Sequence, residues 1–237
     1  MCGRSSLTKS EKELEVRFKA TFYSEDLEKY NPLPNYNVAP TQILPILTNE
    51  DKDHFRPLRW GLIPYWAKDI KIGYKMINAR IETVADKAAF KYALSKRRCL
   101  VPMDGFYEWK KNGKQKTPYR IVLKDQDLFC CAGLWETWKA PDGTKIKSFT
   151  ILTQTPSASI AHIHDRMPAI LTQDQEMSWL DMDIPVQDAL SIITPYPEDM
   201  ITAYIVSSRV GKVTENDAGL IAPVEPPSEK ASQVSLF

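Results

Sequence analysis

The fold is decided by residues 98–153, which read RCLVPMDGFYEWKKNGKQKTPYRIVLKDQDLFCCAGLWETWKAPDGTKIKSFTILT. Four strand-like segments fall in this stretch, at about 98–110, 117–123, 128–138 and 146–153. Turn residues separate them: Asn112-Gly113, Lys124-Asp125-Gln126-Asp127 and Pro141-Asp142-Gly143. Because short turns join successive strands, the segments are expected to pair antiparallel.

Shorter elements flank this centre on both sides. Before it, the sequence predicts a helix over 8–22 with capping-box spacing from Thr8 to Glu11, a Pro- and Asn-rich loop over 31–42, strands at about 43–48 and 56–63, and a helix over 84–95. After it come helices near 173–181 and 185–192 and a strand at 201–206. The expected class is α+β, a single domain with a twisted, barrel-like, mainly antiparallel β core and peripheral helices.

Composition is typical of a globular chain and argues against a membrane protein. Of the 237 residues, 43% are hydrophobic and 26% charged, and no apolar run approaches the roughly 20 residues of a membrane span. The first residues lack the apolar core of a signal peptide. Only four cysteines are present, which argues against disulfides. We therefore expect a cytoplasmic protein.

Net charge excludes a strongly basic nucleic-acid-binding domain. The chain has 31 Lys and Arg against 30 Asp and Glu, giving a formal charge of +1. A local basic groove remains compatible with this balance.

Cys2 has the most distinctive chemistry. Cytosolic aminopeptidases remove an initiator Met that precedes a small residue, so the mature chain is predicted to begin at Cys2. Its α-amine, with a pKa of about 7.7–8.0, would then lie two carbons from a thiol of pKa about 8.5. With an aldehyde, the amine forms a Schiff base and the thiol closes a thiazolidine ring. With an amide, the thiol attacks while the amine acts as base.

The residues beside Cys2 favour a functional cysteine over an accidental one in a frayed terminus. Gly3 permits close approach of the backbone to a ligand. Arg4 is a fixed cation that can lower the pKa of a neighbouring thiol or hold a phosphate.

Three further residues are candidates for proton transfer and charge stabilisation. Glu108 stands between two aromatic residues, where loss of solvent would raise its pKa and suit a general acid or base. His164 is a candidate to protonate a leaving oxygen, and Asn78 to donate to a developing charge. Taken singly, each has a commoner interpretation. Glu108 would be a surface strand residue paired with a lysine, His164 a core or capping histidine, and Asn78 a turn residue.

Metal and cofactor binding are not expected. His162 and His164 have the spacing of a metal pair on one strand face. Neither a Cys-x-x-Cys pair nor a neighbouring third histidine completes a site.

Several polar and aromatic residues are candidate nucleic-acid contacts. Trp66, after Pro64-Tyr65, is a candidate stacking platform, whereas Trp60 is a candidate core residue. The remaining candidates are Arg4, Arg80 and Arg166 as phosphate contacts, together with Asn37 and Pro40 in the 31–42 loop. Taken singly, the arginines are typical of a protein surface and the loop residues of a turn.

Together, these segments resemble the SRAP family (SOS response-associated peptidase), also called abasic-site processing proteins. The resemblance rests on Met-Cys-Gly-Arg at 1–4, Tyr-Asn-Val-Ala-Pro at 36–40, Trp-Gly-Leu-Ile-Pro at 60–64, Asn-Ala-Arg-x-Glu-Thr at 78–83, Gly-Phe-Tyr-Glu-Trp at 105–109 and Ile-His-Asp-Arg-Met-Pro at 163–168. A closing motif at 206–213 extends it, in the right order, over about residues 2–215.

The resemblance implies an activity. The family binds single-stranded DNA and crosslinks to abasic sites through a thiazolidine between its N-terminal cysteine and the ring-opened sugar aldehyde, which protects the lesion during replication. By that similarity, Cys2 crosslinks, Asn78 orients the adduct, Glu108 transfers protons at the Schiff base and His164 assists opening of the sugar ring. The name "peptidase" reflects release of Met1, for which self-cleavage and an external aminopeptidase both remain open.

The resemblance also implies DNA contacts and a domain. Arg4, Arg80 and Arg166 match positions that hold the DNA backbone, and Asn37, Pro40 and Trp66 match positions near the lesion, the last two by stacking. The expected catalytic domain spans 2–221, its partner is single-stranded DNA containing abasic sites, and its location is the cytoplasm, in association with the nucleoid.

Two other functions use the same residues. An N-terminal-nucleophile amidohydrolase or cysteine peptidase would use Cys2 on an amide substrate. A non-covalent reader of single strands or modified bases would use the basic and aromatic residues alone.

Residues 222–237 are predicted to form a flexible tail because they are rich in Pro, Ser and Glu. The sequence ends in Gln233-Val234-Ser235-Leu236-Phe237, which resembles the peptide by which bacterial DNA-processing proteins bind the sliding clamp. Leu236 and Phe237 would fill an apolar pocket, and Gln233 would hydrogen-bond at its rim. The alternative is that the two apolar residues pack back onto the domain.

Overall fold

A computed structural model describes residues 2–124 and 127–225 of the chain. At its centre, five strands close on one another in the order β4–β5–β11–β10–β7, with β7 returning to β4. The β5–β11 pairing is parallel and the other four are antiparallel. Their bounds are β4 (Ile43–Thr48), β5 (Asp51–Trp60), β7 (Arg98–Met103), β10 (Phe129–Lys139) and β11 (Lys145–Gln154).

A second, antiparallel sheet carries the chain's N-terminal strand. Its order is β14–β9–β8–β1–β3, with β1 (Ser5–Leu7), β3 (Asn35–Val38), β8 (Gly105–Asn112), β9 (Gln115–Leu123) and β14 (Ile201–Ile205). Four short strands attach to the central ring: β2 (Thr21–Phe22), β6 (Asn78–Arg80), β12 (Met167–Pro168) and β13 (Ile170–Leu171). Each is two or three residues long and completes an edge.

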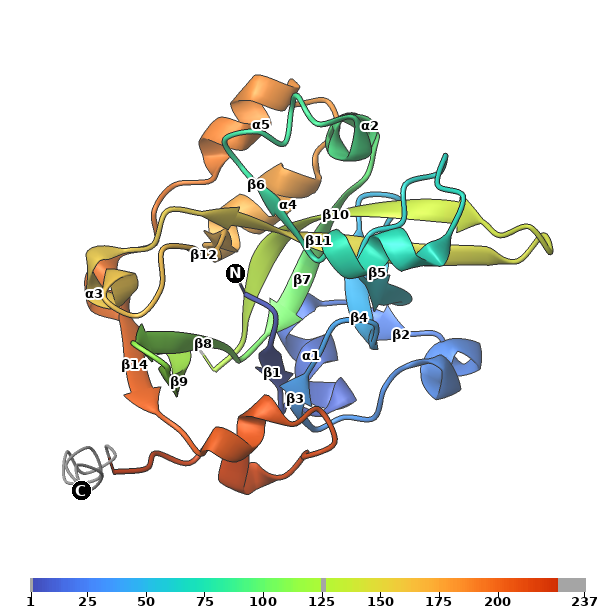
Figure 1. The fold of residues 1–237 in the computed structure, drawn as a ribbon. Helices are drawn as coiled ribbons and strands as arrows, with labels where there is room; N and C mark the ends of the chain where they lie inside the picture. Colours follow the sequence, from blue (N-terminus) through green and yellow to red (C-terminus); the bar gives the residue numbers. More distant parts are fainter. Residues whose placement is uncertain (1, 125–126, 226–237) are drawn as a thin grey trace.

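Helices lie around these strands (Figure 1). The α-helices are α1 (Glu11–Phe18), α2 (Ala88–Lys96), α3 (Ala158–Ala161), α4 (Gln173–Leu180) and α5 (Val186–Ile192). The described residues also form five 3₁₀ helices: η1 (Ser24–Lys29), η2 (Ile70–Lys75), η3 (Glu198–Met200), η4 (Ser208–Gly211) and η5 (Ala218–Leu220). Within the described part of the chain, no helix is long and apolar enough to cross a membrane. The predicted α+β class with a barrel-like core is confirmed.

The predicted strand over 98–110 is wrong in one respect, because it breaks at Asp104 into β7 of the ring and β8 of the second sheet. The buried Asp104 carboxylate accepts hydrogen bonds from the Ser6 hydroxyl at 2.5 Å and the Thr8 hydroxyl at 2.6 Å, and pairs with Arg120 at 2.9 Å. Thr8 is therefore held by Asp104 and does not cap a helix. The capping box is formed instead by Ser10 and Glu13.

Other boundaries also differ from expectation. The 31–42 loop contains strand β3, and the helix predicted over 84–95 begins only at Ala88. The tight turn expected at Asn112-Gly113 lies one residue later, at Gly113-Lys114, where Gly113 has a φ of 56°. Asn112 instead pairs with Gln115 in the ladder. These differences shift the boundaries of elements by one to four residues and leave the order of the predicted elements unchanged.

Candidate active site

Cys2 is fully buried, at 0% exposure, and is not part of a frayed end. Strand β1 holds it there, pairing antiparallel with β8 through Ser5 opposite Phe106 and Ser6 opposite Gly105. Continuing this register toward the N-terminus sets residue 3 opposite Glu108. The backbone pairing thus carries Cys2 close to Glu108 of β8, and Figure 1 shows the N-terminal segment reaching the middle of the molecule beside β8.

The structure raises the pKa of the Cys2 thiol well above its usual range. Burial is the main cause, and the negative charge of Glu108 adds to it. Arg4 lowers this pKa only through its backbone, because its guanidinium, the cation expected to act on the thiol, is directed toward Asn37 and the Val210 carbonyl. The thiol lies 3.8 Å from the Arg4 carbonyl oxygen, to which it donates. Cys2 is therefore a protonated thiol that needs a base before it can attack.

Asn78 holds the backbone of Cys2 from the opposite side. Its Nδ2 donates to the Cys2 carbonyl oxygen at 2.7 Å. Strand β6 sets this contact through its parallel pairing with β11, where Asn78 stands beside Ile151. Among the described residues, the buried Asn78 Oδ1 has no hydrogen-bond partner. This oxygen is thus available to a donor on a reacting group next to Cys2.

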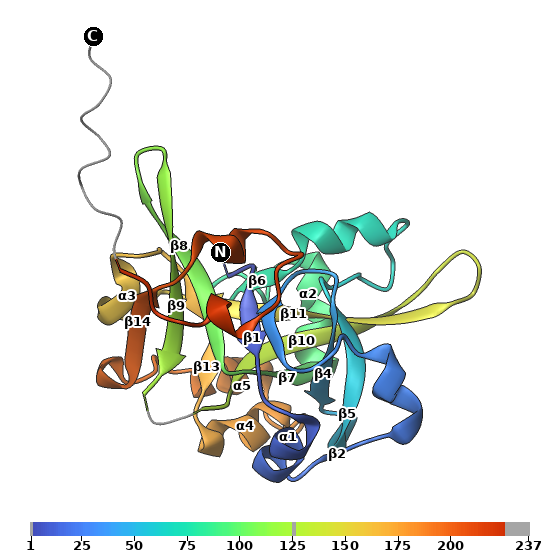
Figure 2. The same ribbon diagram turned by 90° about the horizontal axis from the view of Figure 1, so that it is seen from below.

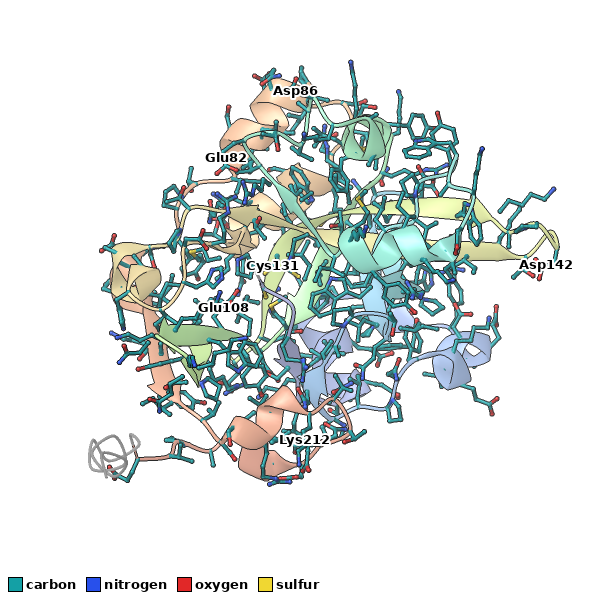
Figure 3. The ribbon with its side chains drawn as sticks, viewed as in Figure 1. Glu82, Asp86, Glu108, Cys131, Asp142 and Lys212 are labelled. Atoms are coloured by element: carbon teal, nitrogen blue, oxygen red, sulfur yellow. The ribbon has the colours of Figure 1, made fainter. Side chains whose placement is uncertain are left out.

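Glu108 is buried, at 3% exposure, on β8, and faces the N-terminal segment (Figure 3). Loss of solvent raises the pKa of Glu108 to about 7. The predicted general acid/base environment is therefore present, and the alternative of a lysine-paired surface residue is wrong. At neutral pH, Glu108 is divided between its acidic and basic forms.

His164 approaches Glu108 from the segment between α3 and β12. Its Nε2 lies 3.7 Å from Glu108 Oε2. Desolvation is the largest cause of the lowered pKa of His164, so the ring is neutral at pH 7. Its Nδ1 accepts the backbone N–H of Arg166 at 3.0 Å, which leaves the proton on Nε2, toward Glu108. The exposed Asp165 carboxylate, 2.9 Å from Nδ1, would favour the other tautomer, but it is free to turn into solvent whereas the backbone donor is fixed.

A hollow opens outward from this pair. It has a volume of about 380 Å³ and is lined by Glu108, Trp109, Lys111, Lys116, His164 and Gly211. A second hollow of about 310 Å³ shares Trp109, Lys111 and His164 and continues past Lys110. Glu108 and His164 therefore border a surface depression that carries basic side chains.

Arg4 and Asn37 lie together, but their side chains bind the protein itself. Arg4 Nη1 donates to Asn37 Oδ1 at 2.7 Å and to the Val210 carbonyl at 2.5 Å. Asn37, 1% exposed, donates to the carbonyls of Lys212 and Glu215 at 2.9 and 2.8 Å. These bonds tie β1 and β3 to the segment after β14, and Gly211 of that segment lines the hollow. DNA contact by Arg4 and Asn37 stays a prediction.

Arg80 and Arg166 converge on the end of β11. Arg80 is exposed and stands opposite Thr153, whose carbonyl oxygen accepts from Arg166 Nη2 at 2.5 Å. Arg166 also forms a two-armed ion pair with Glu82, at 2.7 and 2.9 Å. Arg80 is therefore the freer of the two cations.

Of the remaining predicted residues, Trp66, Trp60 and Pro40 are described by the structure, and three residues of the tail are not. Trp66 is 48% exposed, as a stacking platform requires, whereas Trp60 is fully buried and stacks on Phe149. Pro40 is half-buried at the end of β3. In the described part of the chain, no three His, Cys, Asp or Glu residues group as metal ligands. Gln233, Leu236 and Phe237 lie outside the described residues.

Sequence reasoning missed the lysines beside the site. Lys111 and Lys116 line the hollow with Glu108 and His164. The available signal was the density of lysines over residues 110–116, next to the Glu108 motif.

Comparisons with known proteins agree on one family. The profile described as SOS response associated peptidase (SRAP) matches residues 1–213. The chain is 44% identical to the abasic site processing proteins YoqW and YoaM of Bacillus subtilis, over 93% of its length and 99% and 97% of theirs. It is 33% identical to the abasic site processing protein HMCES of Xenopus tropicalis, over 94% of its length and 78% of that protein. A crystal structure from Bacteroides thetaiotaomicron superposes with a TM-score of 0.88 at 27% identity, over 94% of this chain and all of that one.

Proposed function

The chain belongs to the SRAP family, and from this premise we propose that it binds single-stranded DNA and traps abasic sites covalently on Cys2. The observation that carries the proposal is the meeting of four groups from distant segments: Cys2, Asn78, Glu108 and His164. The names of the relatives support abasic DNA as the substrate.

The reaction uses both nucleophiles of an N-terminal cysteine. Once Met1 is removed, the α-amine adds to the C1′ aldehyde of the ring-opened sugar and water leaves, forming an imine. The thiol then adds to the imine carbon while its proton passes to the nitrogen, closing a thiazolidine. The C1′ carbon keeps the oxidation level of an aldehyde in the imine and in the thiazolidine, so the reaction needs no oxidant or reductant.

The surrounding groups have roles that their positions suit. Glu108, with a pKa of about 7, takes a proton from the thiol and returns one to the departing water. His164 carries its proton on Nε2, on the side of Glu108, and would donate it to the sugar as the ring opens. Asn78 fixes the Cys2 backbone through Nδ2, and its unpartnered Oδ1 orients the adduct.

The same groups could also take part in the release of Met1. Self-cleavage would use the Cys2 thiol and Glu108 on the amide between Met1 and Cys2, and an external aminopeptidase is the alternative.

We propose that the adduct shields the lesion during replication in the SOS response, in the cytoplasm at the nucleoid. An abasic site in a single strand has no base to unstack, so the sugar reaches a site beside the surface at little cost.

A denaturing gel tests the proposal. The full chain is incubated with a single-stranded oligonucleotide that carries one abasic site, and a heat-stable shifted band is expected. A shift under native conditions alone would identify a non-covalent reader. Cleavage of a model amide with neither shift would identify an amidohydrolase, and either result overturns the proposal.

Arg80→Ala is expected to weaken binding to single strands of any sequence and to lower the slope of log affinity against log salt by about 0.7. Arg166→Ala should do the same, with an added loss of stability because Arg166 also holds Glu82 and Thr153. Fluorescence anisotropy over a salt series measures both. Lys12→Ala, at an 83% exposed position on α1, is the control and should change neither quantity. An undiminished slope in both arginine variants would place them outside the DNA path.

For residues 233–237, we propose clamp binding, which would bring the protein to replication forks. Deleting these residues should leave crosslinking in solution unchanged and remove association with a sliding clamp from the same source, measured by calorimetry. Leu236→Ala with Phe237→Ala should reproduce the loss, because the two apolar side chains are the anchor. No detectable binding of the full chain to that clamp would overturn the proposal.

A further inference from the structure

The β8–β9 hairpin ends in a cluster of lysines that the proposed reaction does not use. Four of the seven residues from 110 to 116 are lysine: Lys110, Lys111, Lys114 and Lys116. All but the half-buried Lys110 are exposed. Figure 2 shows the hairpin projecting from the body of the molecule, so its end is accessible from several sides.

The ladder sets two of these charges directly against each other. Lys111 pairs with Lys116 across the two strands. Like charges in this position destabilise a hairpin by an amount on the order of a few tenths of a kcal/mol. Within residues 2–124 and 127–225, no ion pair joins any of the four lysines to a carboxylate. The cluster is therefore a positive surface without direct ion pairs, although Asp165 shares a hollow with Lys110 and Lys111, and a bound polyanion would neutralise it.

This surface is continuous with the candidate active site. Lys111 and Lys116 line the hollow that contains Glu108 and His164. The hairpin extends outward from there at about 3.3 Å per residue, so its turn at Gly113-Lys114, which follows Asn112, lies on the order of 15 Å from Glu108. That length spans several nucleotide steps of about 3.4 Å in a stacked strand. A DNA strand leaving the active site along the hairpin would pass each lysine.

We propose that the β8–β9 hairpin is a second DNA contact, which holds the phosphate backbone of the strand flanking the lesion. The inference rests on the proposed function, since the hairpin would act on the same bound strand. The four lysines would add affinity for the flanking strand that does not depend on base identity, because lysines contact phosphates.

The fold offers a matched control. At the end of the β10–β11 hairpin, Lys139 pairs with Lys145 in the same cross-strand arrangement. Figure 1 shows that hairpin projecting on the opposite side of the molecule from β8 and β9. Lys111→Ala with Lys116→Ala is therefore compared with Lys139→Ala with Lys145→Ala, two variants of equal charge and equal cross-strand geometry.

The measurement is equilibrium binding, by anisotropy, of a single-stranded oligonucleotide with a tetrahydrofuran abasic analogue, which has no aldehyde and cannot crosslink. Near 0.1 M salt, the Lys111/Lys116 variant should lose about fivefold in affinity per lysine, and its salt slope should fall by about 1.4. The Lys139/Lys145 variant should match the wild type. With an oligonucleotide too short to pass the lesion, the difference between the two variants should disappear.

Thermal melting of both variants checks that the hairpins remain folded, and removing either like-charged pair should leave the melting temperature unchanged or higher. Equal slopes for the two variants, with the wild type binding DNA, would overturn the hairpin inference and leave the proposed function standing. A wild type that neither binds nor crosslinks single-stranded DNA would overturn both.

Discussion

Cys2→Ala is expected to abolish the heat-stable crosslink to abasic DNA. Alanine keeps the α-amine after Met1 is removed, so an imine still forms, but no thiol is present to close the ring. An imine hydrolyses under denaturing conditions, whereas a thiazolidine persists, so the shifted band should fall to background. The gel described for the wild type measures this directly, and a wild-type yield from Cys2→Ala would refute the assignment.

Two further variants separate the roles of amine and thiol. Cys2→Ser retains the amine and should give a crosslink only when borohydride reduces the imine before denaturation. Cys99→Ala removes a thiol that is equally buried, but on β7 of the ring, and should crosslink as the wild type does. If Cys99→Ala folded fully but lost the crosslink, a buried thiol other than that of Cys2 would be required. That result would contradict the assignment of the reaction to Cys2.

The central fold could be predicted because its strands are long and regularly punctuated. The segments at 128–138 and 146–153 correspond to β10 and β11 within about one residue, since the Pro141-Asp142-Gly143 turn fixes the register between them. The break at Asp104 could not be predicted in the same way. Nothing local signals that the chain leaves the ring there, because the partners that hold the corner, Ser6 and Arg120, are distant in sequence.

The short strands have a different explanation. β6 has three residues, too few for a periodic pattern, and forms only because β11 is already in place beside it. This strand positions Asn78, so one part of the active site depends on an element without a sequence signal of its own.

For the site itself, the sequence indicated residue identities but not their environments. Cys2, Glu108 and His164 could be singled out from chemistry and from the family motifs. The rise in the Cys2 pKa could not, because it follows from complete burial and from the approach of Glu108, which only the β1–β8 pairing brings about. The hydrogen bonds from Arg4 to Asn37 and Val210 could not be predicted either, because Val210 lies 206 residues further along the chain.

Glu108→Gln is expected to slow crosslinking by about 10²–10⁴-fold at saturating DNA while leaving DNA affinity nearly intact. The glutamine keeps the size and hydrogen-bonding capacity of the side chain but cannot take the proton of the buried thiol. Single-turnover kinetics on the abasic oligonucleotide measure the rate, and anisotropy measures the affinity. Glu176→Gln is the matched control, since burial also raises the pKa of Glu176, on α4, where it pairs with Arg17 away from Cys2.

The pH dependence gives the prediction a second, independent readout. If ionised Glu108 is the base, the wild-type rate should rise with pH through about 7, the pKa that burial gives this group. The inflection should disappear in Glu108→Gln. An unchanged rate and an unchanged pH profile in this variant would assign Glu108 to a structural role.

Stability should move in the opposite direction to rate. The folded state raises the pKa of Glu108 from 4.5 to about 7, so it binds the proton more tightly than the unfolded chain does. The free energy of unfolding therefore falls as pH rises from about 4.5 to about 7, and the loss is complete above that range. Glutamine carries no charge to desolvate, so above pH 7 Glu108→Gln should melt at a higher temperature than the wild type. A slower reaction in a more stable protein would show that the fold holds Glu108 in an unfavourable environment because the reaction requires its raised pKa.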